Sequence, residues 1–344
     1  MRIPENIILS RTDSIGDIVL AMPVAGLLKK HFPKIKIALL GQAYTKDIAL
    51  ACEFIDCFID YEDFIKKEIF IEGKKPEAII HLITQSDIAK RAKKLKIPLR
   101  IGTSNRLYHW FTCNKLVSLS RKKSGLHEAQ LNLKLLKPFK IDQPLSLKEM
   151  IPFFGLSRLQ TLLPEYREML STNKYNLIIH PKSRGNAREW RLEHFITLIN
   201  LLDDNRYKIF LSGVESEIPF INLILEKLQK DVTVLAGKIN LAQFISFIKA
   251  ADGVVANSTG PVHVAAALDK DVIGIYPPLK PKDPGRWGPI GTNAQVMVLN
   301  KDCTDCRLTR DQCACINAIL PADLQFRLDV LMQKKYAGKN ENNF

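Results

Sequence analysis

The sequence predicts an α/β protein built from two doubly wound halves, and two observations carry this prediction. Short apolar runs alternate with helical patterns through both halves of the chain, as they do in β-α-β units that form a parallel sheet. A stretch punctuated by Pro144, Pro152 and Pro164 separates the two alternating regions. The length of 344 residues agrees with two domains, because a domain averages about 150 residues.

The first half opens with a β-α-β unit, in which a strand at 6–10 leads through a polar loop into a helix at 18–31 and a strand at 35–40. Ligands bind at the carboxyl ends of the strands in such sheets, so this loop is a candidate site. The other elements expected in this half are helices at 44–52, 62–71, 87–95 and 125–140, and strands at 57–59, 77–83 and 99–102.

The second half repeats the alternation after the linker. The strands expected there are at 175–180, 207–212, 232–235, 253–256 and 272–276, and the helices at 192–202, 217–229, 241–250, from Pro261 onward, and 321–336. We therefore expect a first domain at 1–152, a second at 153–320, and a C-terminal helix with a polar tail at 321–344. This last helix could pack back across the linker onto the first domain.

The stretch 252–268, DGVVANSTGPVHVAAAL, predicts a strand, a tight turn and a helix. Pro261 stands near the first helical position, where its missing N–H costs nothing. The backbone N–H groups of a first helical turn attract anions, most often phosphates. Thr259 offers a small hydroxyl there, and Gly260 leaves the backbone uncovered. An ordinary strand-to-helix connection is the alternative interpretation of this turn taken alone.

The chain is basic, with a formal net charge of +14 and a pI of about 9.4. Residues 87–140 hold fourteen Lys and Arg against two acidic residues, a net charge of +12. Such a concentration attracts anionic partners. A nucleic acid, a phosphorylated lipid headgroup or only solvent would satisfy it.

Several classes of protein are excluded or disfavoured. The N-terminus lacks the pattern of a signal peptide, and no run approaches 18 apolar residues, so no membrane-spanning helix is expected. Seven cysteines fit a reducing cytoplasm better than a disulfide framework. The glycine-rich fingerprints of dinucleotide enzymes and P-loop NTPases are absent. A basic nucleic-acid-binding protein is a weak alternative, because no signature of a nucleic-acid-binding module accompanies the charge.

Three polar loops, at 14–17, 180–190 and 257–263, carry the candidate site residues. Cations beside a helix N-terminus suit a diphosphate leaving group, whose charge develops as the bond breaks. A carboxylate suits a general base that takes a proton from an attacking hydroxyl, although Asp17 could instead be a helix cap. The side chains that these loops offer are Asp17, Lys182, Ser183, Arg184, Arg188 and Thr259.

The sequence resembles glycosyltransferase family 9, which contains the lipopolysaccharide heptosyltransferases. The resemblance rests on IILSRTDSIGDIVLAMPVAGLLKKHFP at 7–33, HPKSRGNAREWRLEHF at 180–195 and NSTGPVHVAAAL at 257–268. It implies the GT-B fold, in which two Rossmann-like domains face a central cleft. It also implies inverting, metal-independent transfer of a heptose from ADP-heptose to the inner core of lipopolysaccharide, with no cofactor. The N-terminal domain would bind the acceptor and the C-terminal domain the nucleotide sugar.

The resemblance also assigns residues. Asp17 matches the proposed base of the family's S-x-G-D motif, and Arg188 stands where the family usually has a Lys that neutralises the diphosphate. Thr259 and Gly260 match the phosphate-binding turn. Ser258 stands where many members have Asp, which puts the identity of the donor sugar in doubt. The full set expected at the donor diphosphate is Lys182, Ser183, Arg188, Ser258, Thr259, Gly260 and His263, with Glu215 at the ribose or base.

A core histidine is the alternative interpretation of His263. Four cysteines lie close together near the C-terminus, at Cys303, Cys306, Cys313 and Cys315. They are enough to bind a structural zinc ion, and free thiols or a disulfide are the alternative interpretations. No metal is expected in catalysis.

The partners expected from the resemblance are a nucleotide sugar and an anionic lipid-linked oligosaccharide of the lipid A–Kdo type. No nucleic acid is expected. The resemblance implies a cytoplasmic protein, peripheral at the inner face of the inner membrane. Transfer from another nucleotide sugar, or to a protein or other glycan acceptor, is the alternative within the same fold.

Overall fold

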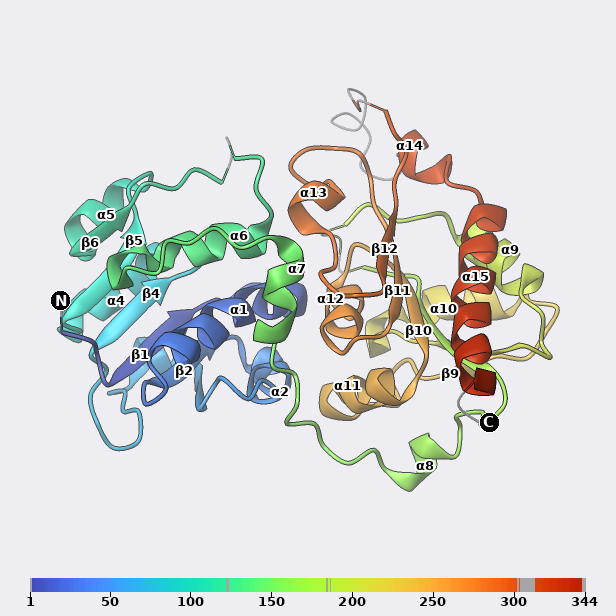
Figure 1. Cartoon of the computed structure of the whole chain (residues 1–344), viewed down its shortest axis with the longest axis horizontal. Helices are drawn as coiled ribbons and strands as arrows, with labels where there is room; N and C mark the ends of the chain where they lie inside the picture. The colour runs from blue at the N-terminus through green and yellow to red at the C-terminus, as the bar shows by residue number, and fades with distance from the viewer. Residues whose placement is uncertain are drawn as a thin grey trace. The chain divides into compact units, whose positions relative to one another are not determined.

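The computed structural model describes residues 2–121, 124–183, 185, 187–301, 303 and 313–341, without the side chains of 337–341. The chain divides into two compact units, Met1–Leu159 and Gln160–Phe344. Each unit holds a six-stranded sheet whose paired strands are all parallel (Figure 1). The prediction of two doubly wound α/β halves is confirmed. The division follows Leu159, whereas the predicted boundary followed Pro152.

The sheet of the first unit has the strand order β3-β2-β1-β4-β5-β6. Its strands are β1 (Asn6–Ser10), β2 (Lys36–Gly41), β3 (Cys57–Asp60), β4 (Ala78–His81), β5 (Leu99–Thr103) and β6 (Lys115–Val117). Its helices are α1 (Ile15–His31), η1 (Ala43–Thr45), α2 (Lys46–Leu50), α3 (Tyr61–Lys66), α4 (Ser86–Lys94), α5 (Leu107–Thr112), α6 (Glu128–Leu133), η2 (Lys134–Phe139), α7 (Leu147–Met150) and η3 (Ile151–Phe153).

The sheet of the second unit has the order β12-β11-β10-β7-β8-β9. Its strands are β7 (Tyr175–His180), β8 (Tyr207–Leu211), β9 (Thr233–Val234), β10 (Gly253–Asn257), β11 (Asp271–Ile275) and β12 (Ala294–Met297). Its helices are α8 (Pro164–Arg167), α9 (Leu192–Leu201), η4 (Glu215–Glu217), α10 (Ile218–Leu225), α11 (Leu241–Ala250), α12 (Gly260–Ala267), α13 (Pro284–Trp287), α14 (Ala314–Asn317) and α15 (Pro321–Glu341).

The central strands β1 and β10 are buried along their whole length, which explains why they are continuous apolar runs in the sequence. The helix expected at 125–140 is divided into α6 and the 3₁₀ helix η2, and Pro138 lies inside the latter, where it cannot donate an α-helical hydrogen bond. Helix α15 packs against α9, and its Leu324 and Leu328 are in the core of the second unit. Its return to the first domain stays a prediction.

The strand order places one switch point in each sheet. In the first unit β2 pairs with one side of β1, and β4 pairs with its other side. In the second unit β8 pairs with one side of β7, and β10 pairs with its other side. Loops that leave such neighbouring strands separate at the carboxyl edge and form the usual binding crevice of an open α/β sheet. The predicted motifs at 14–17, 180–190 and 257–263 follow β1, β7 and β10 respectively.

Candidate active site

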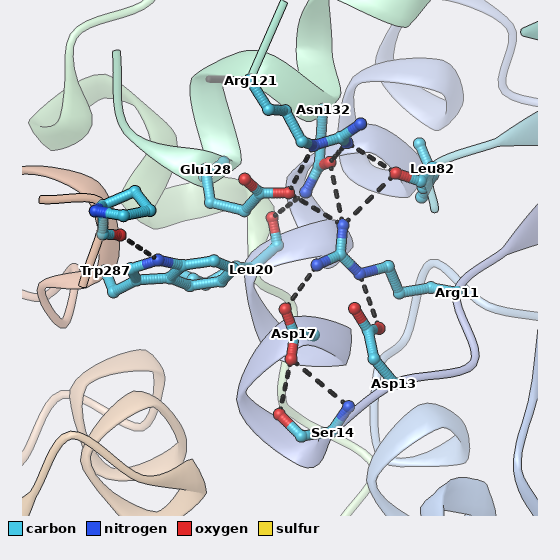
Figure 2. Close-up of polar contacts among 12 residues, drawn as sticks. Arg11, Asp13, Ser14, Asp17, Leu20, Leu82, Arg121, Glu128, Asn132 and Trp287 are labelled. Carbon is cyan, nitrogen blue, oxygen red and sulfur yellow. Dashed lines mark hydrogen bonds and ion pairs between the residues drawn. The ribbon is translucent and has the colours of Figure 1, made fainter. Parts of the chain in front are cut away.

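Arg11 is the centre of a buried polar network at the switch point of the first sheet (Figure 2). It directly follows β1, and its side chain is only 3% exposed. The guanidinium donates to Asp13 at 2.7 Å, to Glu128 at 2.9 Å and also to Asp17. One cation therefore holds three carboxylates that come from the loop after β1, from α1 and from α6.

Asp17 lies in the first turn of α1. Its carboxylate accepts hydrogen bonds both from Arg11 and from Ser14, the residue that precedes the helix. The Ser14 hydroxyl donates to it at 2.6 Å and the Ser14 backbone N–H at 3.3 Å. Burial opposes ionisation, but the charge of Arg11 and the hydrogen bonds from Ser14 outweigh it, so the pKa of Asp17 lies below its usual value. The capping interpretation of Asp17 is thus correct as geometry, and the same contacts keep the group ionised and fixed.

Asp13 has the opposite environment, although it shares the same arginine. Burial raises its pKa to about 6, since Arg11 offsets only part of the desolvation and the negative charge of Asp17 adds to it. The three carboxylates around Arg11 raise the pKa of the guanidinium despite its burial, so Arg11 remains charged. Two neighbouring carboxyls whose pKa values are driven apart are typical of sites that move protons.

The far side of the network comes from α6 and the segment before it. Arg121 donates to Glu128 at 3.0 Å and to Asn132 at 3.0 Å, and both arginines donate to the Leu82 carbonyl after β4. Asn132 also donates to the Leu20 carbonyl of α1. Sequence reasoning missed Arg11, Asp13 and this outer set. The positions around 121–132 lie more than a hundred residues beyond Arg11, and only the strand order brings them beside it.

Asn257, at the end of β10, organises the site of the second unit. It is fully buried, its side-chain amide donates to the Pro181 carbonyl at 2.7 Å, and its side-chain oxygen accepts from the Trp190 backbone N–H at 2.9 Å. These bonds tie the turn after β10 to both ends of the loop after β7. The two predicted motifs of this unit are therefore neighbours in the structure.

The loop after β7 contains an acidic residue that the sequence analysis overlooked. Glu189 forms an ion pair with Lys182 and accepts hydrogen bonds of 2.8 Å from both the backbone N–H and the hydroxyl of Ser183. The Lys182 ammonium also lies 4.6 Å from the centre of the Phe220 ring. The charge of Lys182 is thus already compensated within the loop. Arg188 is buried, with 8% exposed surface, and Arg184 lies outside the described residues.

The predicted phosphate turn has the expected form. Thr259 is the N-cap of α12 and Gly260 its first residue, with Pro261 beside it. The Thr259 hydroxyl donates to the Asn257 carbonyl at 3.1 Å, which fixes the turn. Ser258 hydrogen-bonds the side chain of Tyr276, the residue after β11. The N–H groups of the first turn of α12 have no partners within the helix, so this turn can accept an oxyanion.

The remaining predicted residues occupy different positions. His263 is buried within α12, with 5% exposed surface, as the core interpretation expected. Glu215 is exposed in η4, directly after the loop that follows β8. Its neighbour Glu217 is buried instead and accepts from the Val214 backbone N–H at 2.9 Å. Glu215 is therefore the acidic side chain of this loop that a ligand could reach.

The cysteine cluster is only partly described, because Cys306 lies outside the described residues. Cys303 and Cys315 approach to 3.6 Å between their sulfur atoms, and Cys313 and Cys315 are buried in the core of the second unit. Within the described ranges, no group of three or more His, Cys, Asp or Glu side chains is arranged to hold a metal ion. The structural zinc site stays a prediction.

Two of the three carboxyls on Arg11, those of Asp13 and Asp17, predict opposite effects of pH on stability. Because the pKa of Asp13 is raised to about 6 in the folded chain, its ionisation opposes folding, and this cost is absent in Asp13→Asn. We expect Asp13→Asn to increase the free energy of unfolding by about 1–3 kcal/mol near pH 8, since one pKa unit is about 1.4 kcal/mol. The gain shrinks as the pH falls from about 6 to about 4 and is lost below that, where Asp13 is protonated in both the folded and the unfolded chain. Urea unfolding at the two pH values measures it.

Asp17→Asn is the matched comparison for this experiment. The lowered pKa of Asp17 means that its carboxylate stabilises the fold above its unfolded pKa, and that this contribution is lost as the pH falls. The variant should therefore be less stable than the parent near neutral pH. Equal shifts of the same sign in both variants would contradict the assigned electrostatics.

The fold and the two loop clusters define a GT-B protein, the class in which two Rossmann-like domains form a glycosyltransferase. The E. coli ADP-heptose LPS heptosyltransferase II has this fold, with a TM-score of 0.75 at 18% identity, over 96% of this chain and 99% of that one. E. coli heptosyltransferase WaaC with ADP gives a TM-score of 0.65 at 19% identity, over 95% and 99%.

The chain belongs to glycosyltransferase family 9 (heptosyltransferase), whose sequence model matches residues 73–316. A Haemophilus influenzae protein assigned provisionally as a glycosyltransferase is 29% identical over 83% of this chain and 86% of its own. The lipooligosaccharide heptosyltransferase 2 of the same organism is 25% identical over 71% and 63%. This protein is therefore a glycosyltransferase, and the resemblance found in the sequence is confirmed.

Proposed function

We propose that this enzyme transfers a heptose from ADP-heptose to a hydroxyl of the lipopolysaccharide inner core, by an inverting and metal-independent reaction. Family membership supports the sugar, and the names of the relatives support the donor and acceptor. The single observation that carries the proposal is the Asp17 carboxylate, which Arg11 and Ser14 hold ionised at the switch point of the first sheet.

Asp17 is proposed as the general base. As the acceptor oxygen attacks the anomeric carbon from the side opposite the diphosphate, its proton passes to the Asp17 carboxylate. The bond from the anomeric carbon to the phosphate oxygen breaks, and its electron pair leaves with ADP. Because its pKa is lowered, Asp17 accepts the proton late, once the attacking oxygen has become strongly acidic. Arg11 is the positioning residue, since it orients the carboxylate without touching the sugar.

The donor diphosphate is proposed to bind at the first turn of α12, with Thr259 and Gly260 supplying backbone N–H groups. Among the predicted cations of the described loop, we propose Arg188 over Lys182, because Arg188 stands two residues before Trp190, where the family usually has a Lys that neutralises the diphosphate. Arg188 would stabilise the charge of the departing ADP, in the role of the family's lysine. Ser183 and His263 would support the turn, and Glu215 would contact the ribose.

The proposed acceptor is an anionic, lipid-linked oligosaccharide of the lipid A–Kdo type at the cytoplasmic face of the inner membrane. The net charge of +12 over residues 87–140, in the unit that carries Asp17, supports an anionic acceptor. None of the helices in the described part of the chain is long and apolar enough to cross a bilayer.

The donor is tested by the thermal shift that ADP, UDP, GDP and CMP each produce. A ligand that binds only the folded state stabilises it by about 2.7 kcal/mol at a hundred times its Kd. We expect ADP alone to raise the Tm by about 5 °C or more. Arg188→Gln should weaken this shift more than Lys182→Gln does.

A different nucleotide-sugar donor is the second candidate. Ser258 stands where many members of the family have Asp, and it is hydrogen-bonded to the side chain of Tyr276. A shift with UDP or GDP and none with ADP would reject ADP-heptose as donor. It would favour a family 9 enzyme that uses another nucleotide sugar.

A further inference from the structure

Helix α5 exposes an unusually large apolar surface for its length. Leu107, Trp110 and Phe111 are spaced as i, i+3 and i+4, so they share one face of the helix. Their exposed fractions are 76%, 61% and 68%. A soluble helix normally turns such a face toward the core, and a cluster of large exposed apolar side chains marks an interaction site. We call these three residues the α5 face.

The opposite side of α5 is firmly anchored, so the exposure does not come from a loosely attached helix. His109 is fully buried, its imidazole accepts from the Thr103 backbone N–H at 3.0 Å, and it stacks on His81 of β4. Arg100 of β5 donates to the Thr112 carbonyl at 2.7 Å. The Trp110 indole N–H is bonded to the Ser104 carbonyl at 2.9 Å, which leaves the apolar ring outward.

The surroundings of the α5 face are basic. The forty residues from Ile88 to His127 contain eleven Lys and Arg and no Asp or Glu. Helix α4 packs against α5 and exposes Lys90, Lys93 and Lys94, and Lys93 donates to the Phe111 carbonyl at 2.8 Å. Arg106 and Lys115 are exposed before and after α5. The nearest acidic side chain before this stretch, Asp87, is hydrogen-bonded to Tyr61.

We propose that the α5 face docks on an anionic membrane surface, with its aromatic and leucine side chains in the headgroup region and the surrounding Lys and Arg on lipid phosphates. Apolar side chains with aromatic members, bordered by basic residues, are the pattern of helices that lie in a membrane interface. The charge selects an anionic surface, because each basic residue near it contributes about 1 kcal/mol. A nucleic acid would explain the charge without requiring an exposed leucine.

The position of α5 fits the proposed function, on which the identity of the lipid rests. Helix α5 follows β5, and Asp17 follows β1 in the same unit. The two strands are separated by β4 alone, so they lie about 10 Å apart. A lipid-linked sugar at the docked surface would therefore reach the same unit that carries the proposed base.

Sedimentation of the full chain with vesicles tests the proposal, using phosphatidylcholine alone and an equimolar mixture with phosphatidylglycerol. We expect binding to the mixed vesicles only. The double variant Trp110→Gln with Phe111→Gln should bind these vesicles about tenfold more weakly. A tenfold loss corresponds to about 60 Å² of aromatic surface that is no longer buried, at about 25 cal/mol per Å². Phe326→Gln, on α15 and 71% exposed, is the matched control and should leave binding unchanged.

The charge is tested separately. Lys90→Gln with Lys94→Gln should weaken binding about 30-fold at low salt and reduce its salt dependence, at about 1 kcal/mol for each residue. Lys227→Gln with Lys238→Gln, exposed in the second unit, is the control pair. Unchanged near-UV circular dichroism verifies the fold of each variant. The assay contains neither donor nor acceptor, so a wrong donor leaves its outcome unaffected.

Three results would overturn the proposal. Vesicle binding that is unchanged by the Trp110 and Phe111 substitutions would show that another surface docks. A parent dimer that these substitutions dissociate, without vesicle binding, would assign the α5 face to a second copy of the chain. Binding to single-stranded oligonucleotides, lost in both double variants and unmatched by vesicles, would assign it to nucleic acid.

Discussion

Asp17→Asn is expected to slow heptosyl transfer by about 10³-fold, within the range of about 10²–10⁴ that a general base contributes. The amide has nearly the same shape and still accepts the hydrogen bonds from Ser14, but it cannot take the acceptor proton. ADP binding should change by less than about twofold, because the proposed donor residues lie in the second unit. Rates of ADP release and the thermal shift with ADP measure the two effects separately.

Asp13→Asn is the control for this prediction, since it also removes a carboxylate from Arg11. It should keep transfer within about tenfold of the parent, because Asp17 stays ionised and anchored. If Asp17→Asn retained more than about a tenth of the parent activity, Asp17 would not be the base.

Arg11→Met is expected to destabilise the chain by about 3–5 kcal/mol, the cost of removing one partner from a buried ion pair. The substitution leaves Asp13, Asp17 and Glu128 without their central cation, and the Glu128 side chain is only 1% exposed. Protonation of the unpaired carboxyls reduces this destabilisation. The decrease in the free energy of unfolding should therefore be larger near pH 8 than near pH 5. Urea unfolding at both pH values measures the change.

Arg2→Met is the matched control, because Arg2 also bridges two acidic residues, Glu5 and Glu77, but is 79% exposed. Exposed ion pairs contribute about 0–1 kcal/mol, so this variant should unfold almost like the parent. A loss below about 1 kcal/mol in Arg11→Met would show that the network does not hold the site together.

The fold was predictable because its determinants are local. Buried parallel strands such as β1 and β10 are continuous apolar runs, and the turns between them carry their own signals. Helix α5 was not predicted. The stretch from Leu107 to Thr112 is short, and its large apolar side chains are exposed to solvent. An apolar face that serves an interface does not follow the periodicity of a face that serves the core.

The site was predictable only where a motif lies in one loop. Asp17, Thr259 and Gly260 could be selected because they lie where a strand is followed by the start of a helix, and their roles stay predictions. The partners that set their chemistry are distant in sequence. Glu128 reaches Arg11 through the order of β1 and β4, and Asn257 joins Pro181 through the pairing of β10 with β7. Such contacts follow from topology, which periodicity alone does not give.

Mass spectrometry of the acceptor tests the central claim most directly. The purified chain is incubated with ADP-heptose and a lipid A–Kdo acceptor in the presence of a metal chelator. The account predicts that the acceptor gains one heptosyl unit, that ADP is released in equal amount, and that Asp17→Asn yields neither product. An acceptor that stays unmodified with ADP-heptose but gains a sugar from another nucleotide donor would contradict the account, as would transfer that the chelator abolishes.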